Sequence, residues 1–240
     1  MGVTINCDMG EGFSLYECGD DAGLMPFVDI ANVACGFHAS DPSVMRATVA
    51  LAARHGVAVG AHPSFPDLQG FGRREMTMDR EELAACLIYQ IGALKGFLDE
   101  KRLKLNHIKP HGALYGAAMR HEHVANGIAD AAQIFDVPLL CMRGTLQEEV
   151  YAARGVPFLA EYYADLDYDA SGGLIITRKH DAKDPEEAAR RVKRVLLDNK
   201  ATTTEGTLID MRADTICIHS DTPGAVELAR AVRQAVGEVA

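Results

Sequence analysis

Near its start the chain reads Val3-Thr4-Ile5-Asn6-Cys7-Asp8-Met9-Gly10-Glu11-Gly12, an apolar, β-branched run that passes into acidic residues. Such a run predicts a buried β-strand. Short apolar runs of this kind recur along the 240 residues, and nearly all of them have ionisable residues at their C-terminal ends. We predict seven strands in all: Val3–Cys7, Ile30–Cys35, Val57–His62, Leu105–Lys109, Val137–Met142, Pro157–Glu161 and Thr215–His219.

Helical patterns fill several gaps between these strands. One apolar face at helical spacing is formed by Leu83, Leu87, Ile91, Leu94 and Leu98, and a second one by Leu228, Val232 and Val236. Helix starts are predicted where a capping side chain precedes a first-turn proline, at Asp41-Pro42, Asp184-Pro185 and Asp221-Thr222-Pro223. Thr145 with Glu148 and Asp79 with Glu82 have the spacing of capping boxes, and Gly56 is placed as a helix stop.

Alternating strands and helices indicate an α/β fold with a mostly parallel sheet. An open sheet gathers its polar residues at one switch point, whereas a closed β/α barrel spreads them over many strand ends. The polar residues here are spread, so we predict a TIM-like barrel as a single domain over residues 1–240. The part from Tyr162 to Ala213 is less regular, and its glycines (Gly172, Gly173 and Gly206) indicate a hairpin near Leu174–Thr177.

Composition excludes several classes of protein. The formal net charge is −10, and clustered cations are lacking, which argues against a nucleic-acid partner. No apolar run approaches the roughly 18 residues of a membrane span, and no secretory signal is evident. Six cysteines occur without a CxxC pair and are interpreted as reduced core thiols. We therefore expect a cytoplasmic protein without a membrane partner.

The ionisable residues at the strand ends form the candidate site, because strand ends of a barrel converge on one mouth. A single histidine at a strand end is usually structural, so the inference rests on the joint pattern. The candidate catalytic residues are Asp8, Glu11, His38, His62, Lys109, His111, Glu161 and His219. The candidate substrate-binding residues are Asn6, Arg73, Arg74, Asp165 and Asp221, although Asp221 fits a helix cap equally well.

Two chemistries fit this set of residues. Asp8, His38 and His62 have the right side chains to hold a divalent metal that activates water. Alternatively, carboxylates and histidines act as general acids and bases, with Lys109 stabilising negative charge. The sequence contains no P-loop for ATP and no Gly-x-Ser-x-Gly nucleophile turn.

Several long motifs resemble the LamB/YcsF family, and the resemblance covers nearly the whole chain. They are 6–12 (NCDMGEG), 31–38 (ANVACGFH), 60–63 (GAHP), 66–74 (PDLQGFGRR), 89–94 (YQIGAL), 109–115 (KPHGALY) and 219–225 (HSDTPGA). The resemblance implies an irregular seven-stranded β/α barrel, similar to glycoside hydrolase and deacetylase barrels. It also implies hydrolysis of 5-oxoproline to L-glutamate, coupled to ATP hydrolysis in a complex with subunits B and C.

The missing P-loop is consistent with a nucleotide site held mainly by those partner subunits. The substrate would then be an anion, for which Lys109, Arg73, Arg74 or the helix start after Asp221 are candidate binding groups. Two alternatives stay open: a metal-dependent, deacetylase-like hydrolase of another lactam or small amide, and a non-catalytic substrate-binding subunit.

One departure from the family pattern concerns specificity. Leu166 stands where the family usually has arginine, in the segment 161–168 (EYYADLDY). If that arginine contacts substrate, this protein prefers a different lactam unless Arg143 or Arg178 compensates. Ser64 and Ser220 are smaller departures.

Overall fold

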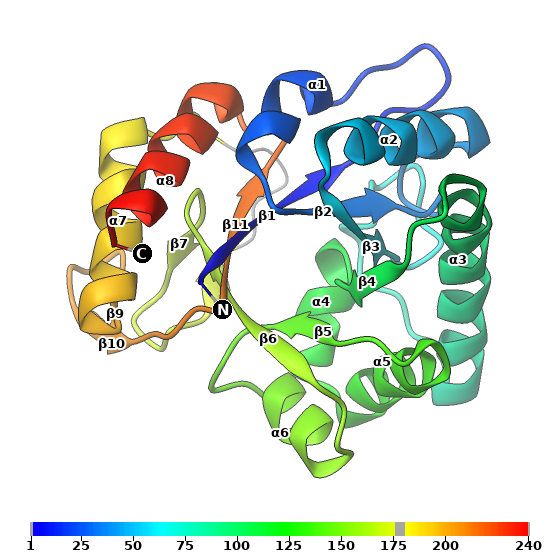
Figure 1. The fold of residues 1–240 in the computed structure, drawn as a ribbon. Helices are drawn as coiled ribbons and strands as arrows, with labels where there is room; N and C mark the ends of the chain where they lie inside the picture. The colour runs from blue at the N-terminus through cyan, green and yellow to red at the C-terminus, as the bar shows by residue number, and fades with distance from the viewer. Residues whose placement is uncertain (1, 176–180, 240) are drawn as a thin grey trace.

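The computed structural model describes residues 2–175 and 181–239, in which seven parallel strands close into a barrel (Figure 1). The strand order around the barrel is β1-β11-β6-β5-β4-β3-β2. The strands are β1 (Thr4–Met9), β2 (Ile30–Ala34), β3 (Ala58–His62), β4 (Leu105–Ile108), β5 (Leu139–Cys141), β6 (Phe158–Tyr163) and β11 (Thr215–His219). All seven predicted strands are present, so the prediction of a β/α barrel is confirmed. The barrel is irregular, because the register between β3 and β4 shifts between Val59 and Ala61.

Helices surround the barrel, and α7 and α8 pack side by side at its left in Figure 1. The helices are α1 (Asp21–Leu24), the 3-10 turn η1 (Met25–Phe27), α2 (Pro42–His55), α3 (Arg80–Lys101), α4 (Gly112–Ala118), α5 (Glu122–Phe135), α6 (Leu146–Ala153), α7 (Pro185–Asp198) and α8 (Ala225–Val239). Within the described ranges, none combines the length and apolar character needed to cross a bilayer.

The apolar faces predicted for two helices are buried. All five residues on the predicted face of α3, from Leu83 to Leu98, are completely inaccessible to solvent. On α8, Leu228 and Val232 are also completely inaccessible, and Val236 is buried. These faces join the interior of the strands in one continuous apolar core, so helical spacing alone identified the side of each helix that meets the barrel.

Helix ends follow the predicted caps in part. Asp41 accepts hydrogen bonds from the backbone of Ser43 and Val44 at the start of α2, and Gly56 ends this helix in the left-handed conformation (φ 69°). Asp184 caps α7 as predicted. Asp221 does not cap a helix, because α8 begins only at Ala225 and the Asp221 carboxylate pairs with Arg73 instead.

The prediction of two capping boxes is also wrong. Glu148 accepts from the backbone nitrogen of Gly144 instead of Thr145, and the Thr145 hydroxyl donates to Met142 O. Asp79 precedes α3 without a side-chain capping bond. The spacing of a capping box is therefore present at both sites without its geometry.

Two hairpins interrupt the alternation after β6. The first joins β7 (Asp167–Tyr168) to β8 (Leu174–Ile175) in antiparallel pairing, where a hairpin was predicted; Thr177 lies outside the described residues. The second joins β9 (Lys200–Thr202) to β10 (Leu208–Asp210) and was not predicted separately. The first hairpin matters for the site, since Leu174 reaches the cavity at the barrel mouth.

Candidate active site

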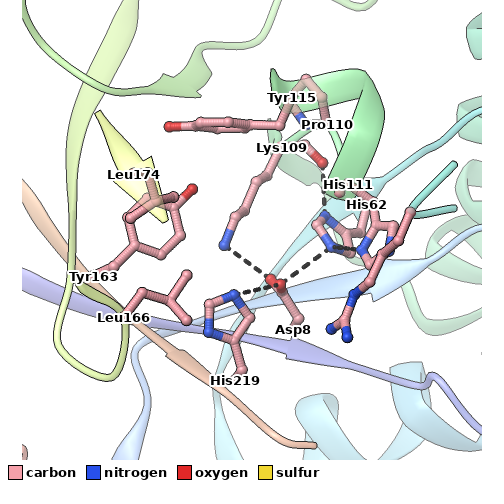
Figure 2. A pocket seen from close by; sticks show the side chains of 12 residues that line it. Asp8, His62, Lys109, Pro110, His111, Tyr115, Tyr163, Leu166, Leu174 and His219 are labelled. Atoms are coloured by element: carbon pink, nitrogen blue, oxygen red, sulfur yellow. Dashed lines mark hydrogen bonds and ion pairs between the residues drawn. The ribbon is translucent and has the colours of Figure 1, made fainter. Parts of the chain in front are cut away.

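One cavity lies at the C-terminal ends of the strands (Figure 2). Parallel strands that close into a barrel bring these ends to a common rim. The register places Asp8 of β1 beside His219 of β11 and Asn32 of β2. The cavity is lined by Asp8, His62, Arg73, Lys109, Pro110, His111, Gly112, Tyr115, Tyr163, Leu166, Leu174 and His219. Side chains from positions 8 to 219 thus meet at one place.

Lys109 is a buried cation held between two carboxylates. Its Nζ lies 3.0 Å from Asp8 Oδ1 and 3.0 Å from Glu161 Oε1, and it donates to Cys217 Sγ at 2.9 Å. Burial lowers the pKa of Lys109, but the charge of Asp8, followed by the contact with the Cys217 sulfur and the charge of Glu161, outweighs burial and raises this pKa well above its ordinary value. The ammonium therefore stays charged beside the cavity.

Asp8 presents its second carboxylate oxygen to two histidines. Oδ2 lies 3.2 Å from His62 Nε2 and 3.6 Å from His219 Nε2. Burial raises the pKa of Asp8, but the charges of His62 and Lys109 outweigh it and hold the pKa well below its usual range. Asp8 is thus an ionised carboxylate at neutral pH.

His219 is oriented by Asp165. The carboxylate of Asp165 accepts from the backbone nitrogen of His219 at 2.8 Å and lies 3.0 Å from its Nδ1. Burial lowers the pKa of His219, but the charge of Asp165 and its hydrogen bond raise it to about 9. The imidazole is therefore protonated at neutral pH, with Nε2 directed toward Asp8 and the cavity (Figure 2).

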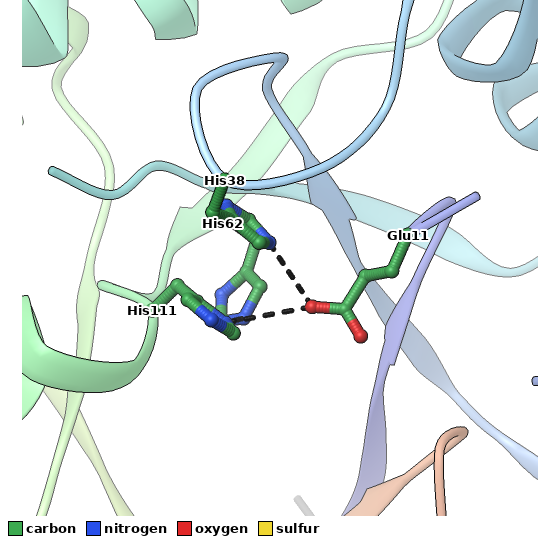
Figure 3. A group of neighbouring side chains, drawn as sticks. All are labelled: Glu11, His38, His62 and His111. Carbon is green, nitrogen blue, oxygen red and sulfur yellow. Dashed lines mark hydrogen bonds and ion pairs between the residues drawn. The ribbon is translucent and has the colours of Figure 1, made fainter. Parts of the chain in front are cut away.

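A second group of donors lies beside Asp8 and consists of Glu11, His38, His62 and His111 (Figure 3). Backbone carbonyls fix two of these rings: His62 Nδ1 donates to Lys109 O at 2.7 Å, and His111 Nε2 donates to Phe71 O at 2.8 Å. His62 Nε2 and His111 Nδ1 then face each other at 2.9 Å. In neutral rings both atoms carry lone pairs, so a proton or a cation must lie between them.

The other two members of this group, Glu11 and His38, lie within hydrogen-bond distance of each other. Glu11 Oε1 lies 3.0 Å from His38 Nε2 and 3.4 Å from His111 Nδ1. Burial, together with the charge of Asp8, raises the pKa of Glu11 to about 8, and burial holds the pKa of His38 well below its usual value. His38 Nδ1 is buried and has no hydrogen-bond partner among the described residues.

These four side chains fit a divalent metal. Three imidazoles and one carboxylate are a common ligand set, and carbonyl bonds to the far nitrogens of ligating histidines are a usual supporting feature. Neighbouring donor atoms are 2.9–3.4 Å apart. The set shares His38 and His62 with the one expected from sequence, but it has Glu11 and His111 where Asp8 was expected.

The remaining predicted residues lie around the cavity or apart from it. Glu161 is buried behind Lys109, and Asn6 lies beneath it with its Oδ1 3.3 Å from Lys109 Nζ. Arg73 lines the cavity and pairs with Asp221 at 2.7 Å. Arg74 is not among the lining residues; its guanidinium is largely exposed and pairs with Asp67.

Sequence reasoning missed part of the cavity wall. Tyr163 stacks on His219 and lies beneath the Lys109 ammonium, while Tyr115 lies edge-on to Tyr163. A signal for Tyr163 existed, because it follows Glu161 by two residues on β6 and so shares its face of the strand. Tyr115 is on α4, and no spacing in the sequence connects it with the strand ends.

Leu166 is part of the cavity wall, where it joins Leu174 and Tyr163 (Figure 2). Arg143 does not reach this wall and lies 3.7 Å from Glu148. Arg178 is outside the described residues. The position singled out as a departure from the family pattern therefore contacts the space in which a substrate would bind.

Comparisons with known proteins agree on one family. The model of the LamB/YcsF family matches residues 3–239. The chain is 44% identical to "Lactam utilization protein lamB" of Emericella nidulans, over 98% of this chain and 94% of that protein. It is 47% identical to a 5-oxoprolinase A-subunit of Pseudomonas aeruginosa, over 96% of this chain and 93% of that protein. The crystal structure of a lactam utilization protein from Thermus thermophilus superposes with a TM-score of 0.92 at 45% identity, covering 99% and 97% of the two chains.

Proposed function

Because the chain belongs to the LamB/YcsF family, we propose that it hydrolyses a cyclic amide, 5-oxoproline, to L-glutamate as the A component of a multi-subunit enzyme. The observation that carries this proposal is the convergence of Lys109, Asp8 and His219 on one cavity. An ammonium, an ionised carboxylate and a protonated imidazole can serve as oxyanion donor, general base and general acid in the opening of an amide ring.

The reaction adds water across the ring amide bond. A water oxygen bonds to the carbonyl carbon, the C–N bond breaks, and the nitrogen leaves as an amine after gaining a proton. Lys109 holds the oxygen that becomes negative, as an oxyanion donor does. Asp8 Oδ2 takes the proton of the attacking water, and His219 gives its Nε2 proton to the leaving nitrogen. Arg73, at the cavity wall, binds the carboxylate of the substrate.

Coupling to ATP, in association with subunits B and C, is the second part of the proposal. An unstrained five-membered lactam is a poor electrophile. Transfer of the γ-phosphoryl group of ATP to the amide oxygen, with ADP as the leaving group, would make it a better one, and the addition of water with ring opening would then release inorganic phosphate. The sequence has no P-loop, so the nucleotide binds mainly to the partner subunits. The test is glutamate release from 5-oxoproline with ATP and all three subunits, omitting each component in turn. Release that needs neither ATP nor the partners contradicts this part.

The third part of the proposal concerns a divalent metal at Glu11, His38, His62 and His111. A bound ion would supply Lewis-acid chemistry beside the cavity. The chain's own residues prepare the site, because the carbonyls of Lys109 and Phe71 orient two of the rings. This donor set favours a second candidate function, in which the protein hydrolyses a small lactam or amide alone, without ATP.

Metal content provides a direct prediction. We expect about one Zn²⁺ or similar ion per purified chain, and we expect His38→Leu to lower metal affinity by about tenfold or more, since it removes one of four ligands. Calorimetric titration of the metal-free protein and elemental analysis measure this. His123→Gln is the control, because it replaces an exposed histidine outside the group. This variant should bind the metal with wild-type affinity. Equal affinity in wild type and His38→Leu would disprove the site.

Leu166 provides a prediction about substrate choice. Leu166→Arg places a cation in the cavity wall and should lower KM for 5-oxoproline about tenfold relative to 2-pyrrolidinone, the same ring without the carboxylate, because a charge-assisted bond adds on the order of 1.5 kcal/mol. Leu166→Met is the control. Unchanged relative KM values would show that this wall does not contact the carboxylate.

A further inference from the structure

The barrel interior directly below the cavity is polar. Barrels of parallel strands are usually filled with bulky apolar side chains. Here Asn6, Asn32, His107 and Thr215, from four different strands, are all completely inaccessible to solvent. Burying amides and an imidazole costs free energy unless every group is hydrogen-bonded, so such a layer needs a specific reason.

One chain of hydrogen bonds in this layer leads from His107 through Asn32 to Asp8, and a branch leads from Asn32 through Asn6 to Thr215. The Asn32 amide nitrogen donates to Asp8 Oδ1 at 2.7 Å and to Asn6 Oδ1 at 2.8 Å. A carboxylate only accepts, so the orientation of the Asn32 amide is determined. Its oxygen must then accept, and it does so from His107 Nε2 at 2.6 Å.

The protonation state of His107 agrees with its role as the donor to Asn32. Burial, followed by the charge of Lys109, lowers its pKa to about 3, so the ring is neutral. Because Asn32 Oδ1 only accepts, the one proton lies on Nε2. Nδ1, which faces the Asn106 side-chain amide at 2.9 Å, then accepts, so that amide presents its nitrogen to the ring.

Space for the ring depends on Gly60, since a Cβ atom at that position would lie 2.2 Å from His107 Nε2. Gly60 is the register partner of Asn32, which is in turn the partner of Asp8. The bonded row thus joins residues of β4, β2 and β1, and Gly60 of the intervening strand β3 leaves the space that the His107 ring occupies.

This row determines how Asp8 faces the cavity. Oδ1 is occupied by Asn32 and by Lys109 Nζ at 3.0 Å. Oδ2 is thereby left to face His62 and His219 at the cavity. Without Asn32 the carboxylate could rotate about its terminal bond, because that torsion is only weakly restricted by itself.

We propose that Asn32 and His107 are positioning residues for the lactam hydrolysis inferred above: His107 orients Asn32, and Asn32 holds Asp8 with Oδ2 toward the cavity. Neither residue lines the cavity, so neither touches substrate. The inference rests on the proposed function for its kinetic effect, but its structural part, the orientation of Asp8, is independent of which reaction takes place.

The kinetic test compares removal with conservative replacement. Asn32→Leu and His107→Leu should each lower kcat about 100-fold, with KM within about threefold, because a misplaced reacting group costs about this much. His107→Gln keeps an N–H donor at a similar reach and should retain kcat to within about tenfold of wild type. If His107→Gln loses as much as His107→Leu, or if the loss is in KM alone, the proposal is wrong.

Gln147→Leu is the matched control, since Gln147 is also a completely buried amide but lies on α6, outside the barrel, and donates to Tyr115 O. It should lower the unfolding midpoint while leaving kcat per folded enzyme unchanged. Should Asn32→Leu not fold, the two His107 variants decide alone.

Crystal structures separate this proposal from the proposed function. In Asn32→Leu and His107→Leu the Asp8 carboxylate should be rotated or split between orientations, whereas His107→Gln should keep the wild-type orientation. An unmoved carboxylate in His107→Leu would overturn the positioning role even if the wild type is an active lactamase. Conversely, wild-type protein that opens no lactam with its partners and ATP would disprove the function while these structures still test the row.

Discussion

Lys109→Met should reduce lactam hydrolysis about 1000-fold, which is the upper range for loss of one oxyanion donor. The reason is that Lys109 Nζ is the cation 3.0 Å from both Asp8 and Glu161 at the cavity. Its removal leaves two buried carboxylates facing each other, and breaking such a buried pair typically costs about 3–5 kcal/mol of unfolding free energy. Single-turnover glutamate release and urea unfolding at pH 7 measure the two effects separately.

Lys104→Met is the control for this variant. Lys104 is exposed and lies just before the same strand, β4, so its loss should change neither turnover nor stability measurably. Lys109→Arg tests geometry, because it keeps the charge but replaces a compact ammonium, placed 3.0 Å from two carboxylates, by a larger planar guanidinium. Hydrolysis by Lys109→Met within about tenfold of wild type would exclude Lys109 as the oxyanion donor.

Asp165→Asn should lower kcat at pH 8 by about 100-fold or more, within the usual range for general acid catalysis. The carboxylate of Asp165 raises the pKa of His219 to about 9, against the lowering effect of burial. Without that charge the pKa falls, so the imidazole is neutral at pH 8 and has no Nε2 proton to give. Wild-type kcat should decline above about pH 9, and this alkaline limb should move to lower pH in the variant.

The same pair contributes to stability with a defined sign. A histidine whose pKa is raised on folding stabilises the fold fully below its unfolded pKa, and the contribution is lost as the pH rises through about 9. The free energy of unfolding should therefore fall more between pH 6 and pH 10 in the wild type than in Asp165→Asn. Asp169→Asn is the control, since Asp169 is not among the cavity-lining residues and its bonds are local to the β7–β8 turn. An alkaline limb that does not move in Asp165→Asn would exclude His219 as the acid.

Much of the fold was predictable because buried parallel strands appear in the sequence as continuous apolar runs. All seven strands and the buried faces of α3 and α8 follow from that rule. The caps were less predictable, as Asp221 shows. Its position shortly before a proline is typical of a helix cap, yet its carboxylate pairs with Arg73, a residue of the cavity wall. An ion pair between residues so far apart in the chain leaves no trace in local spacing.

The residues of the cavity also divide into those that the sequence predicts and those that only the structure identifies. Asp8, His62, Lys109, His111 and His219 were identifiable as strand-end residues, and the structure places them together. Arg73 and Arg74 are adjacent and equivalent in sequence, but only Arg73 lines the cavity. The choice between them is made by the preceding turn, in which Phe71 and Gly72 both adopt left-handed conformations (φ 55° and 63°).

The sequence by itself determined the barrel, the identity of its strands and the rim at which the chemistry gathers, because burial and strand direction are local properties of each segment. Only the tertiary structure decided which donors face one another: the Glu11, His38, His62 and His111 group, the Asp165–His219 pair and the row from His107 through Asn32 to Asp8. These contacts depend on strand register and barrel closure, which are set by the packing of the whole chain, and a hydrogen bond changes with displacements far smaller than one residue.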